Sequence, residues 1–362
     1  MSRTVYLHIG APKTGTTYLQ DRLTRNVATL AEHAVHFPSR SPLVSPALFH
    51  FRAALDLLGQ DWGGEPGHAK GSWDALVKRI RRRTGTVVVS HEILAPARPR
   101  YVAKAMQDLD GSDVHIVYTA RDLARQLPAA WQESIKQGRK WRYQRFLRQA
   151  EHGRTWFARS FDLPSVLGTW GAHVPPEHIH VVTVPPETTP GDGLWERFCR
   201  AVRIDPAWGP VESSRSNASL GVVETAVLRQ LNVRLDRETR REAAYDHLIR
   251  QMLAEQELVR GDSPRITLPP DDYDWVEERT RQWLEWVDQS GVEVVGDVGD
   301  LMPVRPADGG SWRNPDRVRP RLRFRVAMEA LAAMTNEAAA RPDPDNRLTG
   351  RLRKNAERLR SR

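Results

Sequence analysis

A cation and three hydroxyl groups lie close together near the start of this chain, at Lys13, Thr14, Thr16 and Thr17. They follow residues 5–9, in which apolar and polar residues alternate as in a β-strand. A strand that turns directly into a helix N-terminus aims free backbone N–H groups and the helix dipole at one point. Such a point binds phosphate groups, and the sequence therefore predicts an anion-binding loop here.

The loop differs from the one that nucleoside triphosphatases use. Their G-x-x-x-x-G-K-[ST] motif places a lysine directly after its second glycine. Gly10 and Gly15 have the spacing of that motif, but Thr16 stands at the lysine position and Lys13 comes three residues earlier. We therefore expect a related but different phosphate-binding loop.

The segment Pro12-Lys13-Thr14-Gly15-Thr16-Thr17 resembles the 5′-phosphosulfate loop of sulfotransferases that use 3′-phosphoadenosine 5′-phosphosulfate (PAPS). The resemblance is to the sulfotransferase-like proteins of bacteria and covers roughly residues 4–300. It implies a P-loop-like α/β fold, PAPS as cosubstrate, and a binding site for its 5′ end at residues 13–17. Lys13 would also stabilise the charge that develops on the leaving phosphate.

The resemblance also implies a second anion site, for the 3′-phosphate. The family has an arginine just after its third strand and a serine eight residues later. Arg121 follows the strand predicted at 114–119 and fits the arginine, but the eighth residue after it is Ala129. We expect Ser134 to replace the missing serine. The other polar candidates on this segment are Gln132 and Lys136.

A polar segment at 213–221 could close over the same phosphate. Its Arg215 carries a guanidinium that suits bidentate phosphate binding, with Asn217 or Ser219 beside it. The alternative is an ordinary loop that caps the following helix. Arg121 could also have a structural role instead of binding phosphate, as the partner of Asp122 or Glu133 in an ion pair.

Sulfuryl transfer is an in-line displacement at sulfur, and it needs a base for the acceptor's proton. His91 and Glu92 follow the strand predicted at 86–89. Cytosolic sulfotransferases use a histidine at a strand end, and several carbohydrate and tyrosine sulfotransferases use a glutamate. Adjacent strand residues point to opposite faces, so one of the pair should face the site. His50 and His36 are weaker candidates.

Strand patterns alternate with helical patterns along the first 300 residues, which predicts βαβ units. The fold class expected is α/β, with a central, mostly parallel sheet flanked by helices and with ligands at the carboxyl ends of the strands. Strands are predicted at 5–9, 34–37, 86–89, 114–119 and 178–184, and residues 292–298 with Leu301 are expected to close the domain. Helices are predicted at 18–30, 49–58, 73–83, 192–202, 221–255 and 272–289.

We expect a sulfotransferase-like domain at 1–302, a Pro/Gly/Arg-rich linker at 303–322 and a basic, helical or partly disordered tail at 323–362. Residues 313–362 hold 14 Lys/Arg and 6 Asp/Glu, which accounts for +8 of the chain's net charge of +9. The body is therefore nearly neutral, and we do not expect it to bind nucleic acid. The tail could contact its own domain, a partner protein or an anionic membrane surface.

Composition narrows the class of protein further. A single cysteine, Cys199, excludes an internal disulfide framework. No apolar run approaches the roughly 18 residues of a membrane span, and the sequence starts directly with a strand rather than a signal peptide. We therefore expect a cytoplasmic protein, and the reaction requires no metal.

These features predict transfer of the sulfuryl group from PAPS to a hydroxyl (or amine) of a carbohydrate or small metabolite. The alternatives are a P-loop kinase or other nucleotide-binding protein, and a non-enzymatic protein that binds nucleic acid or membranes through its tail. Some of the tryptophans could stack on the acceptor, although aromatics at helical spacing usually lie in the core. They are Trp62, Trp73, Trp131, Trp141, Trp156 and Trp170.

Overall fold

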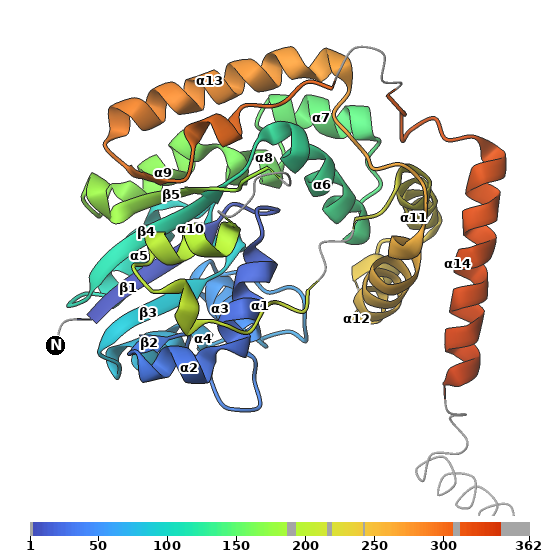
Figure 1. Cartoon of the computed structure of the whole chain (residues 1–362). Coiled ribbons are helices and arrows are strands. Elements are labelled where there is room, and N and C mark those ends of the chain that lie inside the picture. Colours follow the sequence, from blue (N-terminus) through green and yellow to red (C-terminus); the bar gives the residue numbers. More distant parts are fainter. Residues whose placement is uncertain (1–2, 187–192, 216–218, 242, 307–311, 342–362) are drawn as a thin grey trace, which may run out of the picture. The chain divides into compact units, whose positions relative to one another are not determined.

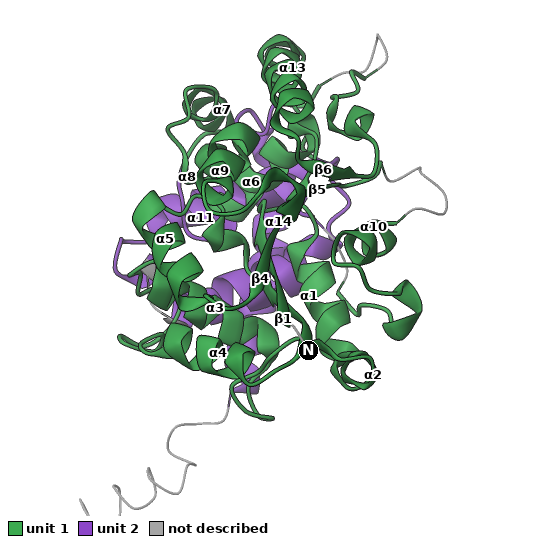
Figure 2. Cartoon of the chain, turned by 90° about the vertical axis from the view of Figure 1, so that its left-hand side faces the viewer, with its two compact units in different colours: residues 1–134, 141–217, 266–313 green, residues 135–140, 218–265, 314–362 purple. Residues whose placement is uncertain are grey.

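The computed structural model describes residues 3–186, 193–215, 219–241, 243–306 and 312–341 of the 362 residues. The chain forms two compact units, coloured separately in Figure 2. Unit 1 comprises residues 1–134, 141–217 and 266–313, and unit 2 comprises 135–140, 218–265 and 314–362. The domain boundaries expected at 302 and 322 remain predictions.

Unit 1 is organised around a six-stranded sheet in the order β2-β3-β1-β4-β5-β6, in which all neighbours run parallel. The predicted α/β class with a central, mostly parallel sheet is confirmed. Because β1 is central, its carboxyl end lies between those of β3 and β4. The strands are β1 (Arg3–Gly10), β2 (Val35–His36), β3 (Gly85–Ser90), β4 (Asp113–Ala120), β5 (Ile179–Thr183) and β6 (Glu293–Val295).

Helices cover both faces of this sheet (Figure 1). On one face, apolar side chains from three helices, Leu23, Leu30 and Phe198 among them, join a core that also contains Cys199. These helices are α1 (Thr16–Arg25), α2 (Val27–Glu32) and α10 (Leu194–Ala201). On the other face, α3 (Pro46–Leu57) packs against β3 and α9 (Leu163–Gly171) against β4. The remaining helices of unit 1 are α4 (Ser72–Arg81), α5 (Pro99–Asp108), α7 (Tyr143–Glu151), α8 (Trp156–Phe161) and α13 (Tyr273–Ser290), while α6 (Leu123–Lys136) runs from unit 1 into unit 2.

The single helix predicted at 18–30 is wrong, because the chain breaks at Asn26 into α1 and α2. The buried Asn26 amide donates to the carbonyl oxygens of Arg22 and Val211, each at 2.8 Å. Its oxygen accepts from the Val211 N–H at 2.9 Å. The side chain thus replaces helical hydrogen bonds and ties the end of α1 to a distant segment, which apolar periodicity cannot reveal.

Unit 2 is helical and contains α11 (Val222–Arg234), α12 (Ala243–Tyr245), the π-helix η5 (Asp246–Glu257) and α14 (Pro320–Ala340). The helix predicted at 221–255 is therefore interrupted after Arg234. One face of α14 buries Val326 and Ala330, while Phe324, Met328 and Leu331 are exposed. None of the helices in the described part of the chain has the length and apolar character needed to span a bilayer.

Candidate functional site

The predicted anion-binding loop connects β1 to α1 at the carboxyl ends of the strands, in the middle of the sheet. Gly15 is the N-cap of α1 and has φ of 94°, a left-handed conformation that favours glycine. A Cβ added there would lie 2.3 Å from Leu194 Cδ2 of α10. The second glycine of the motif is therefore required by both the backbone and a close neighbour.

Gly15→Ala should lower the free energy of unfolding by about 1–3 kcal/mol, the usual cost of a sparsely populated backbone conformation. Urea denaturation measures this loss. Gly67→Ala is the matched control, because Gly67 also has a positive φ, of 80°, but nothing lies within 4 Å of its added Cβ. The contact with Leu194 should make the Gly15 variant the less stable of the two, and equal losses would contradict that contribution.

Two of the three loop hydroxyls hold the loop itself. Thr14 is buried, and its Oγ1 donates to Ala11 O at 2.5 Å while lying 2.5 Å from Thr119 Oγ1. The buried Thr16 Oγ1 donates to the same carbonyl at 3.5 Å. Thr17 is exposed. Of the three threonines, Thr17 is therefore the one whose side chain an anion can reach.

Buried polar side chains on three strands hydrogen-bond to one another and to the loop residue Thr14, and they were not identified from the sequence. His8 on β1 places Nδ1 2.8 Å from Ser90 Oγ on β3 and Nε2 3.2 Å from Thr119 Oγ1 on β4. Burial is the main cause that lowers the pKa of His8 to about 3, and nearby His91 makes a second proton in this region still less favourable. A neutral imidazole can donate through one nitrogen and accept through the other, so His8 links three strand ends to Thr14.

Arg121 lies against the loop that carries Lys13, through the main-chain carbonyl of that residue. Arg121 Nη1, beyond the carboxyl end of β4, donates to Lys13 O at 3.4 Å. Lys13 Nζ lies 3.2 Å from Glu133 Oε2 of α6. Asp122 is the other acid considered as a partner of Arg121. Its carboxylate contacts Arg125. Glu133 is a feature that sequence reasoning did not connect with Lys13.

The helical residues expected near the 3′-phosphate have internal contacts. Ser134 is buried, and its Oγ donates to Trp131 O at 2.7 Å within α6. Lys136 Nζ lies 3.9 Å from Glu255 Oε1. A further α6 residue holds the loop directly, since the buried Gln126 Nε2 donates to Pro12 O at 2.8 Å.

His91 has the geometry of a donor rather than of a base. Burial lowers its pKa to about 3, so the ring is neutral at pH 7. Its Nδ1 accepts from the Ile93 N–H at 3.3 Å. The proton of the neutral ring therefore lies on Nε2, which leaves no free lone pair for an acceptor's proton.

Glu92 lies directly beside the loop. It begins the short 3₁₀-helix η1 (Glu92–Leu94), and a Cβ added to Gly10 would lie 3.3 Å from Glu92 Cα. The structure therefore brings this carboxylate-bearing residue to the first glycine of the motif.

The other two histidine candidates are placed differently. His50 is buried, donates from Nε2 to Pro38 O at 2.9 Å and accepts at Nδ1 from the Ser90 N–H at 3.3 Å, so both ring nitrogens are used. Burial lowers its pKa to about 3. His36 lies on the edge strand β2, and burial lowers its pKa too.

The segment expected to close over the phosphate, residues 213–221, is hydrogen-bonded to Asp21 of α1 at its start. Asp21 Oδ2 accepts from Ser213 Oγ and from the Ser214 N–H, both at 2.8 Å. Arg215 follows with an exposed side chain, and its N–H donates to Ser213 Oγ at 3.1 Å. Asn217 lies outside the described residues, and Ser219 is exposed.

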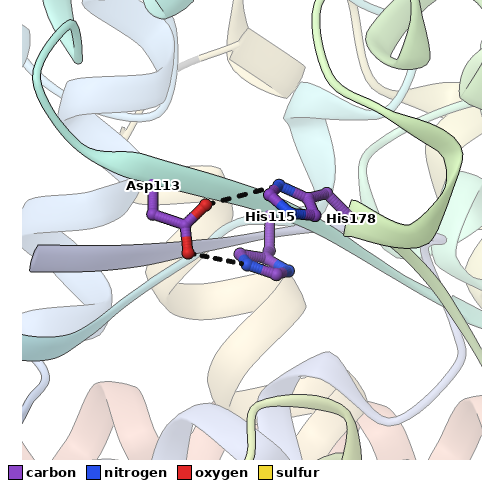
Figure 3. Close-up of side chains that lie close together, drawn as sticks. All are labelled: Asp113, His115 and His178. Atoms are coloured by element: carbon purple, nitrogen blue, oxygen red, sulfur yellow. Dashed lines mark hydrogen bonds and ion pairs between the residues drawn. The ribbon is translucent and has the colours of Figure 1, made fainter.

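A histidine cluster lies at the amino ends of β4 and β5, at the end of the sheet away from the loop (Figure 3). The Asp113 carboxylate lies 3.2 Å from His115 Nε2 and 3.4 Å from His178 Nδ1. His115 Nδ1 lies 2.8 Å from His180 Nε2, and His180 Nδ1 lies 2.7 Å from Glu293 Oε2. The cluster joins residues 65 positions apart, so sequence spacing did not reveal it.

The side chains of Asp113, His115 and His178 lie close enough together to hold a metal ion by proximity alone. However, the His115 and His178 rings are stacked, with centroids 4.0 Å apart and planes 14° from parallel. An imidazole binds a metal through an in-plane lone pair, so one ion cannot lie in the planes of two parallel, separated rings. The arrangement fits a carboxylate shared by two histidines.

A cavity of about 480 Å³ lies near Glu293, which contacts this cluster. None of the predicted site residues lines it. Its lining residues are Arg197, Arg200, Glu293, Val294, Val295, Gly296 and Asp297.

Comparisons with models of known protein families, with curated proteins and with solved structures found no match to the chain. The functional argument therefore depends on the loop at the end of β1 and the groups around it.

Proposed function

We propose that this chain is a PAPS-dependent sulfotransferase with a P-loop-like fold. The observation that carries the proposal is the hydrogen bond from the Arg121 guanidinium to the main-chain carbonyl of Lys13, which places an arginine at the glycine-bracketed loop preceding α1. A loop that carries Lys13 and is contacted by Arg121 from a second strand end suits a ligand with two phosphate-containing ends. The position of β1 between β3 and β4 supports the fold assignment by analogy only.

In this proposal the N–H groups at the start of α1 bind the 5′ end of PAPS, with Thr17 beside them. Lys13 stabilises the charge that develops on the leaving phosphate. Arg121 holds the 3′-phosphate, and Arg215 approaches it from the segment tied to α1. Glu92 takes the acceptor's proton, because the acceptor nitrogen of His91 is already used by the Ile93 N–H.

The test is isothermal titration calorimetry with 3′,5′-adenosine bisphosphate (PAP), the expected product, and with ATP. PAP should bind and ATP should bind more weakly. Lys13→Ala should weaken PAP binding by roughly 10- to 100-fold, as expected for a charge-assisted hydrogen bond of about 1.5–3 kcal/mol. Lys70→Ala, which removes an exposed lysine elsewhere, is the control. Binding of ATP without PAP, or unchanged PAP affinity in Lys13→Ala, would reject the proposal.

Glu133→Gln should instead strengthen PAP binding by about two- to fivefold. Lys13 must leave its contact with Glu133 to bind an anion, and a partly exposed ion pair of this kind is worth about 0.2–1 kcal/mol. The glutamine keeps the shape and removes the competing charge. The same titrations measure this effect, with the exposed Glu65→Gln as control. A weaker affinity would mean that Glu133 positions Lys13 rather than competing for it.

A further inference from the structure

Aromatic side chains continue outward from His91 toward the surface. The ring centroid of Phe51 on α3 lies 5.1 Å from that of His91, 5.2 Å from that of Trp62 and 6.4 Å from that of His68. We call Phe51, Trp62 and His68 the aromatic shelf. Because His91 precedes Glu92 at the end of β3, the shelf begins beside the proposed base.

Trp62 is exposed, yet it is held in place. Its side chain is 47% exposed, and the indole Nε1–H donates to Gln60 Oε1 at 2.8 Å. The Trp62 carbonyl accepts from His68 Nε2–H at 3.1 Å. Gly63 follows with φ of 79°, and a Cβ there would lie 3.1 Å from Phe51 Cζ. Exposure of a large aromatic side chain to water costs free energy. A half-exposed tryptophan that is hydrogen-bonded at its ring nitrogen and its carbonyl therefore suits a binding surface.

Oxygen acceptors lie on the same loop as this indole. Gln60, Asp61 and Glu65 are exposed on the same loop, and Asp61 Oδ2 accepts from the Gly67 N–H at 2.8 Å. An aromatic face is electron-rich and attracts polarised C–H groups, while carboxylate and amide oxygens accept hydroxyl protons. A sugar ring offers both, with an apolar C–H face and a rim of hydroxyls. Small apolar acceptors such as phenols prefer enclosed apolar pockets, and the shelf is open.

We propose that the aromatic shelf binds a neutral saccharide and presents one of its hydroxyls to Glu92. This inference deepens the proposed sulfotransferase function and rests on it for the reaction. In that reaction the acceptor oxygen forms a bond to sulfur, and the bond from sulfur to the 5′-phosphate oxygen of PAPS breaks. The acceptor's proton passes to the Glu92 carboxylate, and PAP leaves with the electron pair of the broken bond.

Saccharide binding can be measured without any reaction. Saturation-transfer-difference NMR on the full chain, with a panel of neutral mono- and disaccharides, should show contact with the sugar C–H protons. Trp62→Ala should abolish this signal and Trp62→Phe should keep it. Leu43→Ala, which changes a side chain that is 97% exposed elsewhere, should also keep it. No signal for any saccharide, or a signal that survives in Trp62→Ala, overturns the shelf proposal.

Turnover with radiolabelled PAPS separates this proposal from the proposed function. Saccharides should be labelled, and Trp62→Ala should raise their KM about tenfold while PAP affinity stays unchanged. Labelling of phenols in place of saccharides overturns the assignment of the acceptor class. If the chain binds saccharides through Trp62 but does not bind PAP, the sulfotransferase proposal fails and the shelf stands as a saccharide site.

Discussion

Glu92→Gln should lower kcat for sulfuryl transfer by about 100- to 10,000-fold, the range that a positioned general base contributes. Glutamine has nearly the same shape as glutamate but cannot take a proton from the acceptor hydroxyl. Glu92 lies against Gly10 at the start of the loop, so its removal acts where the donor would be held. The measurement is transfer of labelled sulfate from PAPS to a saccharide acceptor, with PAP affinity followed in parallel. PAP affinity should change little.

His91→Gln is the informative comparison for this variant. The ring accepts from the Ile93 N–H and contacts Phe51, so its removal should disturb the acceptor side and raise KM more than it lowers kcat. A larger loss of kcat in His91→Gln than in Glu92→Gln would assign the base to the histidine. In that case the hydrogen bond to Ile93 must break during the reaction.

The free energy of unfolding should fall by several kcal/mol as the pH decreases from about 6.5 to 4. Burial lowers the pKa values of His8, His50 and His91 to about 3 and that of His180 to about 4. Unfolded histidines have pKa values near 6.5, so in this window the unfolded chain binds protons that the folded chain does not. Stability therefore rises with pH across the window and is fully present above about pH 6.5.

Urea denaturation at intervals between pH 4.5 and 7.5 measures this dependence. His8→Gln should reduce the slope, because it removes one proton that only the unfolded state takes up. His173→Gln, which replaces an exposed histidine, should leave the slope unchanged. A stability that stays constant over this range would mean that the buried histidines are protonated in the folded chain.

Local sequence patterns predicted much of unit 1. The alternating strands, the loop after the first of them and the arginine after β4 depend on neighbours within a few residues, and each lies where the pattern placed it. The contacts that define the chemistry are different. His8 meets Thr119, Lys13 meets Glu133 and Gln126 meets Pro12, each across more than 100 residues. Only the assembled sheet brings such groups together.

The same distinction explains the expectations that changed. A hydroxyl in a phosphate-binding loop suggests a ligand contact, but Thr14 is turned inward by the carbonyl of Ala11. A histidine at a strand end suggests a base, but the turn into η1 gives the acceptor nitrogen of His91 a backbone partner. In both cases the residue type was informative, and the direction of the side chain was decided by a backbone group nearby.

The single cysteine has a practical consequence. Cys199 lies on α10 and is buried in the core between that helix and the sheet, and burial raises the pKa of its thiol far above the ordinary value. Thiol reagents attack the thiolate, so the native chain should be nearly inert toward them. A cysteine introduced at the position of Leu43 or of Trp62 would then be the one reactive thiol. A fluorophore or spin label could be attached there without first replacing Cys199.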